Sequence, residues 1–159
     1  MNLTGCAAAP AWKPESLMTD SRGSLDACQA QILVVDDDWG VRETLTLLLL
    51  RAGYRACAAQ NGIEALQQIQ KQAPTLLLCD LEMPRMSGFE LLPIVRTQFP
   101  RVAVIAMSGS YADGAVPEGV MADAFYYKGA QKPSDLFQIV ADVIRASASR
   151  PQALQERSL

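Results

Sequence analysis

The fold is decided by residues 76–88, which read LLLCDLEMPRMSG. Three leucines and a cysteine form a short apolar run without polar alternation, a pattern typical of a strand buried on both faces of a parallel sheet. The run ends at a carboxylate, Asp80, and Pro84 and Gly88 then indicate a loop before a helical pattern. Asp80 is therefore expected at the carboxyl end of a central strand, where open α/β sheets place their ligands.

The same alternation of strand and helix patterns continues in both directions from this stretch. Strands are predicted at 32–35, 55–59, 75–80, 102–107 and 124–127, and helices at 40–52, 62–72, 88–99 and from Pro133 to about 147. Residues 110–120 contain two glycines and a proline, so a helix there is expected to be short or irregular. This order predicts an α/β fold with a parallel sheet, right-handed crossovers and helices on both faces.

Each predicted helix carries an apolar stripe that is expected to face the sheet. The stripes consist of Val41, Leu45, Leu48, Leu49 and Ala52 in the first helix; Ile63, Leu66 and Ile69 in the second; Phe89, Leu92, Val95 and Phe99 in the third; and Leu136, Ile139, Val140, Val143 and Ile144 in the last. Leu47 and Leu50 lie off the stripe of the first helix, as ordinary exposed apolar residues or as a docking or dimer patch.

Composition narrows the class of protein. The 159 residues carry a formal net charge of −3, which gives no general attraction to nucleic acid or to an anionic membrane. Histidine is absent, which excludes a Ser-His-Asp triad and removes the commonest zinc ligand. Cys57 and Cys79 fall in predicted strands, and we expect them to be small buried hydrophobes in a reducing cytoplasm, without a disulfide framework. Residues 1–30 are expected to form a disordered arm and 148–159 a flexible tail.

Polar side chains collect where the predicted strands end. Asp36, Asp37 and Asp38 follow the first strand, and Asp80, Ser108 and Lys128 follow the third, fourth and fifth. Carboxylates brought together at one sheet edge repel unless a cation lies among them, and oxygen ligands without histidine favour Mg²⁺. An anion that needs both Mg²⁺ and a lysine is typically a phosphoryl group, which a carboxylate can accept. Taken singly, each residue is more commonly a helix cap, a turn residue or a surface charge.

Residues 32–38, 78–88, 106–109 and 127–130 together resemble the four signature blocks of the receiver domain of bacterial two-component response regulators. The resemblance covers residues 31–147 and implies a flavodoxin-like doubly wound (βα)5 fold with strand order 2-1-3-4-5. It also implies roles for the residues at the strand ends. Asp80 is the expected phosphoacceptor. The expected Mg²⁺ ligands are Asp36, Asp37, Asp80 and the backbone carbonyl of Glu82, with Asp38 an extra surface charge or a helix cap.

In the same resemblance Ser108 fills the switch hydroxyl position, Phe125 the switch aromatic position and Lys128 the phosphate-pairing position. Lys132, which precedes Pro133, is the alternative lysine, but only Lys128 directly follows an apolar run. Two departures from the family pattern matter. Phe125 lacks a tyrosine hydroxyl, so a rotamer switch would act by packing alone. Glu82 places a carboxylate beside the phosphorylation site, where it could tune water access and phosphoryl lifetime.

The resemblance implies a stand-alone, single-domain response regulator of the chemotaxis-receiver kind, because about a dozen polar residues follow the last predicted helix. It would accept a phosphoryl group on Asp80 from a histidine kinase or phosphotransfer protein and signal to an unidentified protein target. It would be cytoplasmic, a monomer or weak dimer, without contact to nucleic acid or membrane, and would catalyse only its own phosphorylation and dephosphorylation. The alternatives are a phosphorylation-independent adaptor of the same fold and a Mg²⁺-dependent phosphatase with an aspartyl nucleophile.

Overall fold

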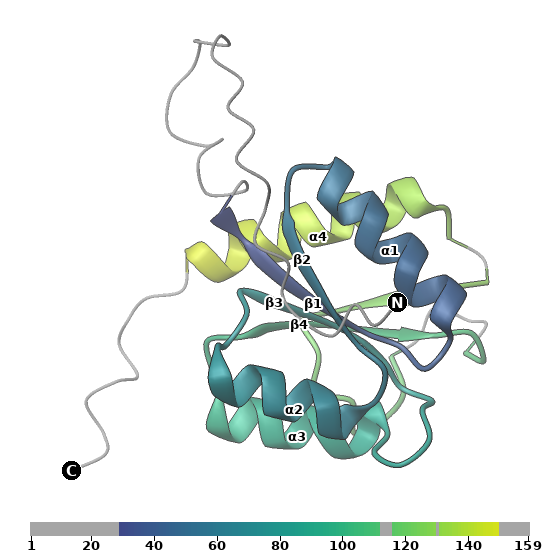
Figure 1. Cartoon of the computed structure of the whole chain (residues 1–159), viewed down its shortest axis with the longest axis vertical. Helices are drawn as coiled ribbons and strands as arrows, with labels where there is room; N and C mark the ends of the chain where they lie inside the picture. The colour runs from purple at the N-terminus through teal and green to yellow at the C-terminus, as the bar shows by residue number, and fades with distance from the viewer. Residues whose placement is uncertain (1–28, 112–115, 130, 150–159) are drawn as a thin grey trace, which may run out of the picture.

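A parallel sheet with helices on both faces occupies the residues that the computed structural model describes, 29–111, 116–129 and 131–149 (Figure 1). Its elements are, in chain order, β1 (Gln31–Val35), α1 (Trp39–Arg51), β2 (Arg55–Ala59), α2 (Gly62–Lys71), β3 (Leu76–Asp80), α3 (Gly88–Gln98), β4 (Ala103–Ser108), β5 (Ala124–Tyr127) and α4 (Pro133–Ala148). The strands are arranged β2-β1-β3-β4-β5, and every neighbouring pair is parallel. The predicted flavodoxin-like order is confirmed.

The core consists of two apolar layers, one on each face of the sheet. Helices α2 and α3 cover one face and α1 and α4 the other (Figure 1). The central strand serves both layers, since Leu77 and Cys79 pack toward α2 and α3 while Leu76 and Leu78 pack toward α1 and α4. All five residues of β3 are buried, as the unbroken apolar run predicted. Asp80 is therefore held at the end of a fully buried strand.

Two glycines set the rotation of α2 and α3, and the predicted stripes of both helices need correction. A Cβ on Gly88 would lie 2.5 Å from the carbonyl oxygen of Asp80, and one on Gly62 would lie 2.8 Å from that of Met86. Of the predicted stripes, Ile69 in α2 and Leu92 and Val95 in α3 are buried as expected. Ala65 and Leu91, which lie three residues after each glycine, are also buried and were not predicted. Ile63 and Phe89 were predicted to be buried but are 44% and 40% exposed.

The other helices follow the prediction more closely. In α4, Leu136, Val140, Val143 and Ile144 are buried, and Ile139 is partly buried against them. In α1, Leu45 and Leu49 are buried, Val41 and Leu48 are half-buried, and Ala52 at the end of the helix is exposed. Leu47 and Leu50 are 48% and 47% exposed.

The segment between β4 and β5 contains no helix among its described residues, 109–111 and 116–123. The rest of the segment in which a short or irregular helix was expected, 112–115, lies outside the described residues. Arg96 of α3 anchors the described part, because its Nε donates to the carbonyl of Met121 (3.0 Å) and its Nη2 pairs with Asp123 Oδ2 (2.8 Å). Asp123 Oδ2 also accepts a hydrogen bond from the backbone N–H of Val104 (2.8 Å). The segment is thereby fixed to α3 and β4 just before β5 begins.

Cys57 departs from the prediction and Cys79 agrees with it. Both are buried, but Cys57 is disulfide-bonded, which contradicts the expectation for that residue, whereas Cys79 is a free thiol. The predicted arm and tail fall mainly on residues 1–28 and 150–159, outside the described residues. None of the helices in the described part of the chain combines the length and the apolar character that a membrane span requires.

Arg85, in the loop between β3 and α3, has a φ of 70°, in the left-handed region that a long side chain adopts only at a cost. Asparagine tolerates this region better. We expect Arg85→Asn to raise the free energy of unfolding by roughly 0.5–1 kcal/mol, measured by urea denaturation. Arg101→Asn, at another exposed arginine without a positive φ, is the matched control and should bring no such gain. A loss of stability in Arg85→Asn would show that the arginine side chain makes a compensating contact.

Candidate functional site

The sheet register brings the predicted site residues to one edge. Val35 is level with Cys79, Asp80 with Met107, and Ser108 with Tyr127. The residues that directly follow β1 and β5 are Asp36 and Lys128. Because all strands are parallel, these carboxyl ends meet at the middle of the sheet, where the chain reverses the direction in which it adds strands.

The turn between β1 and α1 separates three consecutive aspartates into different positions. Asp38 caps α1 by accepting a hydrogen bond from the backbone N–H of Val41 (3.0 Å), which confirms the cap alternative for this residue. Asp36 is fully buried, and its Oδ1 accepts from the backbone N–H of Asp38 (2.9 Å). Arg42 Nη1 donates to the backbone carbonyl of Asp36 (2.6 Å). Asp37 is exposed. The turn thus directs one carboxylate inward and leaves a second one open to solvent.

The loop between β3 and α3 fixes Asp80. Asp80 is 4% exposed, and its Oδ1 accepts a hydrogen bond from the backbone N–H of Glu82 (3.2 Å). Gly88 N–H donates to the carbonyl of Leu81 (3.1 Å), and the absence of a Cβ lets the helix start against the Asp80 carbonyl. A side chain at this position would therefore clash with the backbone at the end of β3.

Lys128 bridges the two buried carboxylates. Its Nζ lies 2.7 Å from Asp36 Oδ2 and 3.1 Å from Asp80 Oδ2, and its backbone N–H donates to the carbonyl of Ser108 (3.0 Å). Burial by itself would lower the pKa of Lys128, but the hydrogen bond to Asp36 and the charges of both carboxylates raise that pKa overall. Lys132 is exposed at the start of α4. The structure therefore places Lys128, and not Lys132, among the carboxylates.

The surroundings of Asp80 disfavour the ionised form of its carboxyl group. Burial raises its pKa, the charge of Asp36 adds to the rise, and Lys128 and the Glu82 N–H only partly oppose it. Carboxylate oxygens of Asp36, Asp37 and Asp80 all lie within 4.8 Å of one another. Three oxygen donors, with a single ammonium group to balance them and one donor open to solvent, fit a hard divalent cation such as Mg²⁺. The acidic triad is thus able to hold a metal ion.

Ser108 and Phe125 lie on the β4 and β5 side of the site. Ser108 is fully buried, and its Oγ accepts from the backbone N–H of Ser110 (3.1 Å). Phe125 is half-buried and packs against the apolar layer under α2 and α3. Sequence reasoning missed Ser110 and Arg42. Their signals are the position of Ser110 two residues after a strand-end hydroxyl, and a basic residue one turn into the helix that follows the acidic strand end.

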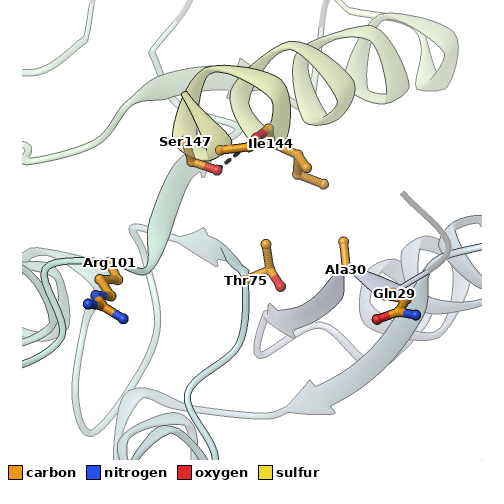
Figure 2. A pocket seen from close by; sticks show the side chains of 7 residues that line it. Gln29, Ala30, Thr75, Arg101, Ile144 and Ser147 are labelled. Atoms are coloured by element: carbon orange, nitrogen blue, oxygen red, sulfur yellow. Dashed lines mark hydrogen bonds between the residues drawn. The ribbon is translucent and has the colours of Figure 1, made fainter. Parts of the chain in front are cut away.

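A hollow of about 330 Å³ lies at the opposite edge of the sheet (Figure 2). Its walls come from the residues just before β1, β3 and β4 and from the last turns of α4: Gln29, Ala30, Thr75, Arg101, Ile144, Ser147 and Ala148. These residues precede the strands, whereas the acidic cluster follows them. The hollow is therefore separate from the acidic cluster and contributes no residue to it.

Comparison with known proteins identifies the family. Residues 32–144 match the family model of the response regulator receiver domain. The chain belongs to this family. Residues 32–144 thus form a receiver domain, which is a phosphoacceptor signalling module, and a domain of this family implies a histidine kinase or phosphotransfer protein as partner.

Curated relatives include longer and shorter proteins. The receiver is 33% identical over 128 residues to the DNA-binding transcriptional regulator NtrC of Escherichia coli K12, a match that covers 80% of this chain and 27% of NtrC. It is 36% identical over 78 residues to sporulation initiation phosphotransferase F of Bacillus subtilis 168, which covers 49% of this chain and 63% of that protein. The chain spans about a quarter of the length of NtrC and of similar regulators.

Solved structures agree with this assignment. TrrA from Thermotoga maritima, in complex with Mg²⁺-BeF, superposes with a TM-score of 0.66 at 29% identity, covering 72% of this chain and 99% of TrrA. A CheY-like receiver domain protein from Methanospirillum hungatei JF-1 superposes with a TM-score of 0.68 at 28% identity, covering 76% and 97%.

Proposed function

We propose that Asp80 accepts a phosphoryl group from a histidine kinase or phosphotransfer protein in a Mg²⁺-dependent reaction, and that the receiver then signals through protein–protein contacts in the cytoplasm. The observation that carries the proposal is the position of the Lys128 ammonium group between the Asp36 and Asp80 carboxylates, with Asp37 completing an acidic cluster within 4.8 Å. The Lys128 ammonium group would therefore lie close enough to pair with a phosphoryl group on Asp80.

The transfer forms one bond and breaks another. An oxygen of the Asp80 carboxylate bonds to phosphorus, while the bond from phosphorus to the donor imidazole nitrogen breaks and its electrons leave with the imidazole. Mg²⁺, held by Asp36, Asp37, Asp80 and the backbone carbonyl of Glu82, would neutralise charge on the carboxylates and on the moving group. Lys128 would then pair with one phosphoryl oxygen.

The change at Asp80 must reach a surface to serve as a signal. Ser108 can turn its hydroxyl toward a second phosphoryl oxygen, since it directly follows the strand residue paired with Asp80. Phe125 on the neighbouring strand is half-buried and would follow by a change in packing. We therefore infer that the output surface is the side of the molecule formed by β4, β5 and the segment between them.

Incubation with acetyl phosphate tests the proposal without requiring the partner. We expect intact-mass spectrometry to show one added phosphoryl group that hydroxylamine removes, as an acyl phosphate requires. Chelation of Mg²⁺ with EDTA should reduce the adduct to background, because the acidic cluster would then repel the incoming anion. Failure to form an adduct at saturating Mg²⁺ and acetyl phosphate would overturn the proposal. A partner that binds equally well with and without the adduct would instead indicate the adaptor alternative.

A further inference from the structure

Glu82 joins the loop after β3 to two hydroxyl groups at the end of β4. Its Oε2 accepts a hydrogen bond from Ser110 Oγ at 2.7 Å and a longer one from Ser108 Oγ at 3.4 Å. The backbone N–H of Ser110 in turn donates to Ser108 Oγ at 3.1 Å. We call these three residues, Glu82, Ser108 and Ser110, the Glu82 clamp.

The clamp is attached directly to the proposed phosphoacceptor. The backbone N–H of Glu82 donates to Asp80 Oδ1 (3.2 Å), so the residue that binds the Asp80 carboxylate through its backbone reaches Ser108 through its side chain. Ser108 is fully buried, whereas Glu82 and Ser110 are exposed. Glu82 Oε2 is the acceptor found for the Ser108 hydroxyl among the described residues. A buried hydroxyl group without an acceptor costs stability, and Glu82 avoids that cost by accepting the hydrogen bond from Ser108.

We propose that Glu82 is a positioning residue that holds the Ser108 hydroxyl before phosphorylation and competes with the phosphoryl group for it. The inference rests on the proposed function of Asp80 and concerns the regulation of that site. A serine hydroxyl has one proton to donate, so Ser108 can bond either to the Glu82 carboxylate or to a phosphoryl oxygen. Glu82 thus acts as an internal anion that occupies the switch hydroxyl while Asp80 is unmodified.

The distances indicate which part of the clamp moves. Both hydroxyl groups donate to the same charged oxygen, but the bond from Ser110 is short, whereas the contact from Ser108 is near the limit for a hydrogen bond. Ser110 therefore anchors the Glu82 side chain, and Ser108 is the group that transfers. The competition is modest, and removing it should change phosphoryl-analogue affinity by roughly three- to tenfold, the range of one hydrogen bond.

Beryllofluoride, a phosphoryl analogue, measures this competition directly. With Mg²⁺ present, ¹⁹F NMR titration should give an apparent Kd for Glu82→Ala roughly three- to tenfold below that of wild type. In a Ser108→Ala background the same Glu82→Ala change should have little effect, since the hydroxyl for which the two anions compete is gone. In metal-free protein, the backbone amide signal of Ser110 should shift in Glu82→Ala, which reports loss of the clamp independently of ligand binding.

Asp38→Asn is the matched control for simple charge repulsion. It removes one exposed negative charge beside the site, and asparagine keeps the cap of α1. We expect wild-type affinity for beryllofluoride in this variant. Thermal unfolding of all variants checks that they fold, which the exposure of Glu82 and Asp38 favours.

Each outcome has a defined meaning. Equal affinities of wild type and Glu82→Ala, an equal effect of Glu82→Ala with and without Ser108, or an equal gain in Asp38→Asn would each overturn the clamp. In all of these cases beryllofluoride still binds through Asp80, so the proposed function stands. Absence of Mg²⁺-dependent binding to wild type would overturn both.

Discussion

Asp80→Asn is expected to abolish the phosphoryl adduct while making the metal-free protein slightly more stable at pH 7. Asparagine keeps the shape of the side chain but has no carboxylate oxygen to form an acyl phosphate. Intact-mass spectrometry after acetyl phosphate treatment should therefore show no adduct above background. An undiminished adduct would place the phosphoryl group on another residue and contradict the assignment of Asp80.

The stability gain follows from the pKa of Asp80. Burial raises this pKa above its ordinary value, and the charge of Asp36 adds to the rise. An acid whose pKa is higher in the folded than in the unfolded state binds its proton more tightly when folded. Its contribution to stability is present at low pH and is lost as the pH rises through the raised pKa. At pH 7 the ionised carboxylate therefore costs stability, and asparagine removes that cost.

Thermal unfolding in EDTA across a pH series measures the effect. The midpoint of Asp80→Asn should lie roughly 2–5 °C above that of wild type at pH 7, and the difference should shrink as the pH falls through the titration of Asp80. Asp142→Asn is a suitable control, because the Asp142 side chain lies on the surface of α4, is 54% exposed and pairs with Arg145 there. A lower midpoint for Asp80→Asn at pH 7 would show that the charge of Asp80 is fully compensated by Lys128.

The residue pattern was sufficient for a parallel sheet and for the placement of Asp36, Asp80, Ser108 and Lys128 at one edge, whereas the strand order came from the resemblance to the receiver family. The reason is physical: an apolar run that ends at a polar residue marks a strand end, and parallel strands bring their ends together. The choice of Lys128 over Lys132 followed from the same rule, since only one lysine directly follows a strand.

Features that depend on side-chain direction were not predictable in the same way. The rotation of α2 and α3 follows from the close approach of Gly62 and Gly88 to neighbouring backbone, and an apolar stripe drawn from large residues overlooks glycine. For this reason Ile63 and Phe89 were wrongly placed in the core. The hydrogen bond between Glu82 and Ser110 joins two loops across 28 positions of sequence, and no local sequence pattern predicts such a contact.

Lys128→Met is expected to destabilise the metal-free protein by roughly 3–5 kcal/mol, as loss of one partner from a buried ion pair does. It would leave Asp36, which is fully buried, and Asp80, which is 4% exposed, without a cation. Methionine keeps much of the volume of the lysine stem, so the loss reports charge rather than packing. Urea denaturation in EDTA provides the measurement, and Lys132→Met, at the exposed lysine of the same segment, should remain within about 0.5 kcal/mol of wild type.

Two further measurements, one with added Mg²⁺ and one with Asp80→Asn as a second substitution, identify the cause of the lost stability. If the uncompensated carboxylates are responsible, Mg²⁺ should stabilise Lys128→Met more than wild type, because a bound cation replaces the missing charge. Adding Asp80→Asn to Lys128→Met should recover part of the lost stability, since one of the two unpaired carboxylates is removed. An effect of Lys128→Met that neither Mg²⁺ nor Asp80→Asn relieves would mean that the uncompensated carboxylates are not its cause. The same ammonium group is proposed to pair with a phosphoryl oxygen. If Mg²⁺ restores all of the stability lost in Lys128→Met, both Mg²⁺ and Lys128 stabilise the site by neutralising the Asp36 and Asp80 carboxylates.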